Sequence, residues 1–112
     1  MFYIRGDNTL ECEALNVFNQ LTAPPDSANT TVLVQLARIG SPCDGVARWD
    51  GIRRFVIKHG MPVDSVDATV VNATNMGDRS TLEDFVRWGT EVSHREHTML
   101  IMWGHGDGTT LW

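Results

Sequence analysis

One nearly continuous apolar segment, Thr98-Met99-Leu100-Ile101-Met102-Trp103, most strongly constrains how this chain can fold. A short run of this kind is typical of a parallel strand that is buried on both faces of a sheet. It ends at the glycine-rich loop Gly104-His105-Gly106-Asp107-Gly108. In open α/β sheets, ligands and chemistry lie just beyond the carboxyl ends of such strands. His105 and Gly106 therefore form a candidate catalytic pair.

Two further segments extend the α/β pattern toward the amino end of the chain. Met1–Ile4 is strand-like and leads into Gly6, and Thr31–Ala37 is rich in β-branched and apolar residues. Between these segments, apolar residues recur at three- and four-residue intervals, as one face of a helix requires: Leu10, Ala14, Val17, Phe18 and Leu21. A strand, a helix and a strand in this order indicate a right-handed parallel crossover.

Both predicted helices begin at a sequence typical of a capping box, in which a cap residue and an acidic residue three positions later bond each other's backbone. Asn8 and Glu11 fit this pattern for the first helix, which Pro24-Pro25 ends. Ser80 and Glu83 fit it for a second helix. The apolar stripe of the second helix consists of Leu82, Phe85, Val86 and Val92, with Trp88 beside it.

The middle of the chain has a different character. Arg48–Ile57 and Val66–Val71 are partly alternating, so we expect a small antiparallel excursion beside the main sheet. The predicted fold class is therefore α/β, with about three parallel strands, two helices and this excursion. Three strands leave an open edge of unpaired backbone groups. We accordingly expect another strand to follow His105, which would make the chain the front part of something larger.

Length and charge exclude several classes of protein. With 112 residues the chain forms at most one domain. Its net charge of -5 is spread along the chain and leaves no basic surface for nucleic acid. No apolar run approaches the length of a membrane span. Because Met1–Ile4 is already strand-like, no signal peptide is visible. We expect neither nucleic acid nor a membrane as a partner, and the cellular location stays open.

The two cysteines have neither metal-type spacing nor a CxxC pattern. Cys12 falls within the first predicted helix, and Cys43 lies in a turn-rich loop beside Ser41-Pro42. A disulfide between them stays open, but we expect two free structural thiols.

The remaining chemistry-bearing side chains give no second site. His94 and His97 could form a metal site with Glu91 or Glu96, but solvated residues at a helix end are the expected interpretation. Asp107 could orient His105 or form a turn with the glycine that follows, and we favour the turn. The residues identify no metal and no cofactor.

Several segments together resemble the clostripain family of cysteine peptidases, which share a caspase-like fold. They occur in the family's order along nearly the whole chain: Tyr3–Glu11, Val32–Arg38, Trp49–Phe55, Asn75–Asp78, Thr81–Trp88 and Leu100–Gly108. The resemblance implies a three-layer sandwich with a mostly parallel sheet, of which residues 1–112 form the amino-terminal part of a single peptidase domain. Ala37 departs from the family's usual aspartate, so no polar role is expected for Arg38. Arg79 departs from a frequent proline.

The resemblance also assigns roles to the candidate pair. His105 matches the family's catalytic histidine, and Gly106 matches the residue whose backbone N–H helps to stabilise the oxyanion. In such an enzyme a cysteine thiolate attacks, while an imidazole exchanges protons near neutral pH. Neither Cys12 nor Cys43 matches the family's nucleophile, which follows the next strand. We therefore expect the isolated chain to be inactive. The family favours cleavage after arginine or other basic residues, and the resemblance allows a calcium requirement.

Two functions follow from these patterns. The first is the histidine-bearing part of a clostripain-like endopeptidase that acts on polypeptides, completed by a cysteine-bearing fragment of the same protein. The second is a truncated or inactive relative that acts as a protein-interaction module, because an open sheet edge can accept a partner strand. A cysteine-bearing segment in the same reading frame would distinguish the first from the second.

Overall fold

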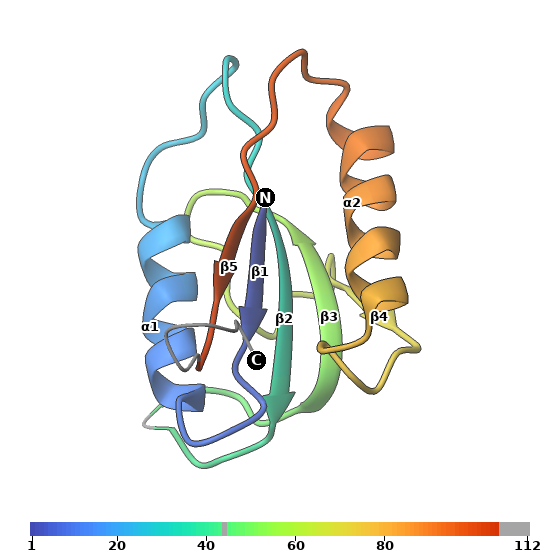
Figure 1. The fold of residues 1–112 in the computed structure, drawn as a ribbon. Coiled ribbons are helices and arrows are strands. Elements are labelled where there is room, and N and C mark those ends of the chain that lie inside the picture. Colours follow the sequence, from blue (N-terminus) through green and yellow to red (C-terminus); the bar gives the residue numbers. More distant parts are fainter. Residues whose placement is uncertain (44, 106–112) are drawn as a thin grey trace.

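The described part of the chain contains five strands and two helices, in the order strand, helix, three strands, helix, strand (Figure 1). The structure is a computed structural model and describes residues 1–43 and 45–105. Its elements are β1 (Phe2–Arg5), α1 (Glu11–Thr22), β2 (Leu33–Ile39), β3 (Asp50–Val56), β4 (Thr69–Val71), α2 (Arg79–Ser93) and β5 (Ile101–Trp103). Neither helix of this described part is long and apolar enough to cross a membrane.

The strands form one mixed sheet in the order β4-β3-β2-β1-β5. β1 pairs in parallel with both β2 and β5, whereas β3 pairs antiparallel with β2 and with β4. The α/β class, the three parallel strands and the antiparallel excursion are thus confirmed. The expected mostly parallel sheet is only partly matched, because β3 follows β2 after a loop with no helix, and a parallel return needs a longer crossover. The caspase-like arrangement stays a prediction.

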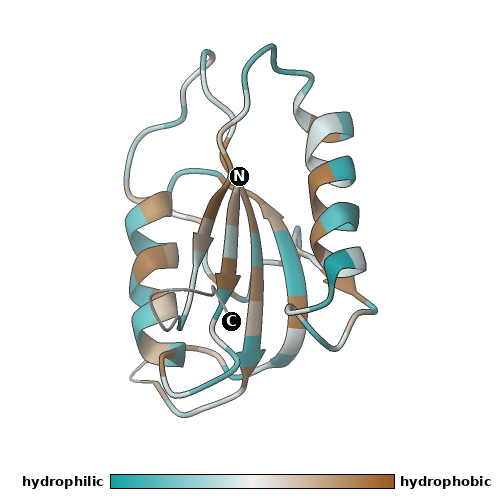
Figure 2. Ribbon diagram, viewed as in Figure 1, coloured by the Kyte–Doolittle hydropathy of each residue, from teal (hydrophilic) through white to brown (hydrophobic). Residues whose placement is uncertain are grey.

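The two helices cover opposite faces of the sheet (Figure 1). Alternate residues of a strand point to opposite faces, so the buried strands supply two separate cores. The core beneath α1 contains Ile4, Val34, Leu36 and Phe18, and the core beneath α2 contains Tyr3, Ala37, Ile52 and Phe85. Figure 2 shows the result as apolar bands along β1 and β2 and as alternating apolar and polar bands on each helix. The centre of the sheet is therefore buried from both sides.

The strand that leads to His105 is shorter and more exposed than the sequence indicates. We expected Thr98–Trp103 to be buried on both faces, but only Ile101–Trp103 is a strand. Met99 is 72% exposed, and Leu100 and Ile101 are also exposed. The expectation is wrong because β5 pairs with β1 alone and forms an edge of the sheet in the described residues.

Neither predicted capping box forms. Asn8 Oδ1 accepts a hydrogen bond from the Leu10 N–H at 2.8 Å, two residues on, and Glu11 turns away into the protein. At the second helix, Ser80 lies inside the first turn, and Glu83 bonds Arg79 instead of the backbone. In both helices the acidic side chain that the capping box requires accepts a hydrogen bond from an arginine guanidinium group instead. Such charge-assisted hydrogen bonds are stronger than those between neutral groups.

The buried face of α2 also differs in part from the predicted stripe. Phe85 is fully buried, but Val92 is 41% exposed. Gly89, four residues after Phe85, faces the sheet instead, and a Cβ there would lie 3.2 Å from Leu33 Cδ1. This glycine lets the end of α2 approach the sheet closely, which periodicity of large apolar residues does not reveal.

Candidate active site

The carboxyl ends of β1, β2 and β5 lie at the same edge of the sheet, the lower edge in Figure 1. We call it the carboxyl edge. The segments that leave it are Gly6–Leu10 after β1, the loop between β2 and β3, and Gly104-His105 after β5. His105 is exposed here, two residues after the strand ends. Gly106 and Asp107, the other candidates of this loop, lie outside the described residues.

A hydrogen-bond contact joins the histidine to the segment after β1. Thr9 Oγ1 lies 3.1 Å from His105 Nε2, within hydrogen-bond distance. The parallel pairing of β1 with β5 sets Ile4 beside Trp103, so the residues that follow the two strands are neighbours. The sequence analysis missed Thr9. A sequence signal for Thr9 existed, because residues that follow adjacent parallel strands are expected to lie at the same edge of the sheet.

The segment that carries Thr9 has its shape fixed on both sides of this residue. Gly6 donates its N–H to the Ala37 carbonyl at 3.1 Å. A Cβ at Gly6 would lie 2.8 Å from Ala14 Cβ, which leaves no room for a side chain. Asn8 accepts from Leu10 N–H and donates to the Arg5 carbonyl at 3.3 Å. Thr9 therefore projects from a turn with a defined backbone.

A buried ion pair lies behind the same edge. Arg38 Nε donates to Glu11 Oε1 at 2.8 Å, and both side chains are almost fully buried. Arg38 also donates to the Ala47 carbonyl at 2.7 Å and lies against the Trp49 ring. We call Glu11 and Arg38 the buried clamp. The expectation of no polar role for Arg38 is wrong, because Arg38 holds the loop after β2 to the start of α1.

The carboxylate of the clamp binds the same loop directly. Glu11 accepts hydrogen bonds from the N–H groups of Gly40 at 3.1 Å and Ser41 at 2.9 Å. Burial raises the pKa of Glu11, but the hydrogen bonds from Ser41 and Arg38 outweigh it, so the pKa lies below its ordinary value. The sequence signal was the position of Glu11 on the helix face of Ala14. An acidic side chain on an apolar face needs a buried partner.

Cys12 and Cys43 form a disulfide, with their Cα atoms 5.6 Å apart. The expectation of two free thiols is wrong. The clamp explains the proximity, because Glu11 already draws Ser41 to the first turn of α1, next to Cys12. A separation of 31 residues gave no hint of this. Neither sulfur is a thiolate nucleophile while the bond is intact, because the thiolate is the reactive form of cysteine.

Charged residues of both signs lie near the carboxyl edge on the side of α2. A cavity of about 270 Å³ is lined there by Asp7, Asp50 and Arg38, together with Ala37 and Thr74. Asp7 also lies 3.6 Å from Arg5 Nε. The cavity wall therefore carries both acidic and basic residues.

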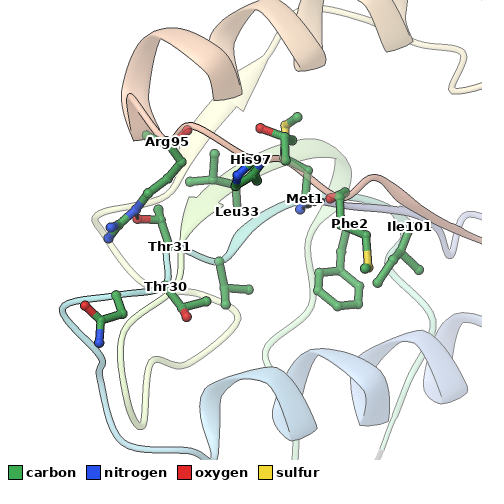
Figure 3. Close-up of a pocket in the computed structure, with 13 residues that line it drawn as sticks. Met1, Phe2, Thr30, Thr31, Leu33, Arg95, His97 and Ile101 are labelled. Atoms are coloured by element: carbon green, nitrogen blue, oxygen red, sulfur yellow. Dashed lines mark hydrogen bonds between the residues drawn. The ribbon is translucent and has the colours of Figure 1, made fainter.

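A second cavity, of about 370 Å³, opens at the opposite end of the parallel strands (Figure 3). We call this end the amino edge. Arg95, His97 and Thr31 line the cavity beside Met1, Phe2 and Ile101. Arg95 is engaged there, since it donates to Thr31 Oγ1 and to the Ala28 carbonyl, both at 3.0 Å. Among the described residues no group of three or more His, Cys, Asp or Glu side chains could hold a metal.

These features define an α/β protein with a mixed sheet and a candidate site around an exposed histidine at the carboxyl ends of its parallel strands. The family model of the clostripain family, a family of peptidases, matches residues 2–111. The chain therefore belongs to the clostripain family, and the resemblance seen in the sequence is confirmed. Membership indicates cysteine peptidase activity with polypeptides as substrates. Among curated proteins, none matches the chain.

Proposed function

We propose that the chain supplies the catalytic histidine, His105, and the oxyanion-stabilising N–H group of Gly106 to a clostripain-type cysteine endopeptidase. The observation that carries this proposal is the position of His105. It follows a parallel strand at the carboxyl edge, is exposed to a substrate, and has one ring nitrogen within hydrogen-bond distance of Thr9. Ligands of α/β proteins bind at this edge.

In the proposed reaction, a cysteine thiolate forms a bond to the scissile carbonyl carbon, and the Gly106 N–H stabilises the negative oxygen. One such donor contributes about 3–4 kcal/mol in the transition state. The His105 imidazolium protonates the leaving amine as the C–N bond breaks, and neutral imidazole then takes a proton from the water that hydrolyses the thioester. The disulfide between Cys12 and Cys43 supports a nucleophile from outside residues 1–112.

The substrate specificity that we propose is for a basic residue on the amino side of the scissile bond. Family membership is the main support. The 270 Å³ cavity near the carboxyl edge adds no net negative charge to this support, because Arg38 lines it beside Asp7 and Asp50, and Asp7 lies 3.6 Å from Arg5 Nε.

The proposal is tested in the complete protein with an arginyl amide and an uncharged amide as substrates. His105→Ala should lower kcat/KM by about 10²–10⁴-fold, the usual contribution of a general acid–base group. His97→Ala is the matched control, since His97 is also exposed but lines the cavity at the amino edge. It should leave the rate unchanged. Undiminished hydrolysis by the His105→Ala protein would refute the assignment.

A second candidate function has its own support. Met99, Leu100 and Ile101 are exposed beside an edge strand, a feature that a partner strand could cover. If the chain acts as an interaction module, the complete protein should contain no thiol whose alkylation by iodoacetamide abolishes peptidase activity. The peptidase predicts one such thiol, and it predicts no hydrolysis by residues 1–112 alone.

A further inference from the structure

We infer that Thr9 is a positioning residue for His105, with its hydroxyl oxygen accepting a hydrogen bond from the Nε2–H group of the ring. This inference rests on the proposed function of His105. The observation behind it is the 3.1 Å separation of Thr9 Oγ1 and His105 Nε2. The hydrogen bond orients the ring, and with the hydroxyl oxygen as the acceptor it keeps a proton on Nε2.

With Nε2 held by Thr9, the other nitrogen, Nδ1, is the one that exchanges protons. A general acid and base must carry its mobile proton on the nitrogen that faces the reacting groups. The imidazolium gives its Nδ1 proton to the leaving amine and becomes neutral imidazole with the Nε2 proton still in place. A later proton from water returns to Nδ1. Nε2 keeps its proton throughout, and Thr9 can accept it in both charge states.

The hydroxyl group is suited to this role because it needs no rearrangement between the two states. Its lone pairs accept from Nε2–H, while its own hydrogen can turn to solvent, since Thr9 is exposed. A hydrogen bond of the imidazolium is charge-assisted and therefore stronger than that of the neutral ring. Thr9 can thus keep its hydrogen bond to Nε2–H while Nδ1 releases its proton.

The backbone around Thr9 is prepared for this contact before any substrate binds. Gly6 donates a hydrogen bond to the Ala37 carbonyl and packs closely against Ala14. Asn8 forms hydrogen bonds with the backbone of Arg5 and of Leu10. Catalytic groups work best when the residues that orient them are themselves held by surrounding packing and hydrogen bonds. Thr9 meets this condition, although it lies on a loop.

The test compares Thr9→Val, which keeps the shape and removes the hydroxyl, with Thr9→Ser, which keeps the hydroxyl. In the complete protein, Thr9→Val should lower kcat about five- to tenfold, the rate equivalent of one hydrogen bond, with KM within about twofold. Thr9→Ser should stay within about twofold of the parent. Thr90→Val is the matched control, because Thr90 is an exposed threonine in α2 whose hydroxyl bonds Val86 O. It should leave kcat unchanged.

A second measurement does not depend on activity. Nitrogen-15 NMR of the histidine rings should show that neutral His105 carries its proton on Nε2. A proton on Nδ1 would overturn the inference, as would a Thr9→Val protein with the parent's kcat or a Thr9→Ser protein as slow as Thr9→Val. Failure of the proposed function is distinguishable, because His105→Ala would then retain activity. If His105→Ala is inactive and Thr9→Val is fully active, the positioning role alone fails.

Discussion

The two ends of the parallel strands are held in different ways. At the carboxyl edge, the buried clamp and the Cys12–Cys43 disulfide tie the loop after β2 to the first turn of α1. At the amino edge, residues 23–30 and 94–100 are exposed, and Arg95 joins these loops through hydrogen bonds of an exposed side chain.

This difference coincides with the position of the candidate site. A histidine that must hold one orientation needs neighbours that do not move, and Thr9 lies just before Glu11 and Cys12, the residues through which the clamp and the disulfide hold the first turn of α1. The amino edge carries no such requirement. We therefore expect the loss of carboxyl-edge contacts to lower stability strongly, and changes at the amino edge to affect neither stability nor catalysis strongly.

The largest expected effect comes from breaking the buried clamp. Glu11→Gln leaves the Arg38 guanidinium buried without its counter-charge, which should lower the free energy of unfolding by about 3–5 kcal/mol. Urea denaturation at neutral pH measures it. Glu13→Gln, two residues along the same helix on its exposed side, is the control and should cost under about 0.5 kcal/mol. Equal losses of unfolding free energy in the two variants would show that the clamp stabilises the fold no more than an exposed glutamate does.

The disulfide comes next. Replacing both Cys12 and Cys43 by serine frees a loop of 31 residues in the unfolded chain, which should lower the free energy of unfolding by about 3–4 kcal/mol. Dithiothreitol should destabilise the parent and leave the double variant unchanged. Because neither sulfur is the proposed nucleophile, the complete protein with both serines should keep its peptidase activity below its melting temperature. Loss of activity in the folded double variant would contradict that assignment.

The clamp also predicts an acid-sensitive stability. The pKa of Glu11 is lowered in the folded protein relative to the unfolded chain. Its contribution is therefore fully present above the ordinary carboxyl pKa of about 4.3, and it is lost as the pH falls through the lower folded value. The gap in unfolding free energy between parent and Glu11→Gln should accordingly narrow between about pH 5 and pH 3. A gap that stays constant over this range would exclude Glu11 as the titrating group.

The sequence predicted the strands and helices because hydrophobic periodicity is a local pattern, whereas the catalytic role of His105 stays a prediction. The sequence did not predict the clamp or the disulfide. Glu11 could either cap the helix or form a buried ion pair. The ion pair forms because the fold brings Arg38 next to Glu11, which the sequence does not reveal. Likewise, Cys12 and Cys43 meet because β2 lies beside β1 and its loop returns to α1. Thr9 was missed for the same reason, since its partner is 96 residues away.

The smallest expected effect is at the amino edge. Arg95→Ala removes the hydrogen bonds to Thr31 and to the Ala28 carbonyl, but its side chain is exposed, and water replaces these partners. The loss in unfolding free energy should therefore stay below about 1 kcal/mol, and kcat/KM of the complete protein should not change. Arg48→Ala, at an exposed arginine between β2 and β3, gives the baseline for removing a surface charge. If Arg95→Ala costs as much as Glu11→Gln, the amino edge is as firmly held as the carboxyl edge. The carboxyl edge would then be no more firmly held than the rest of the sheet.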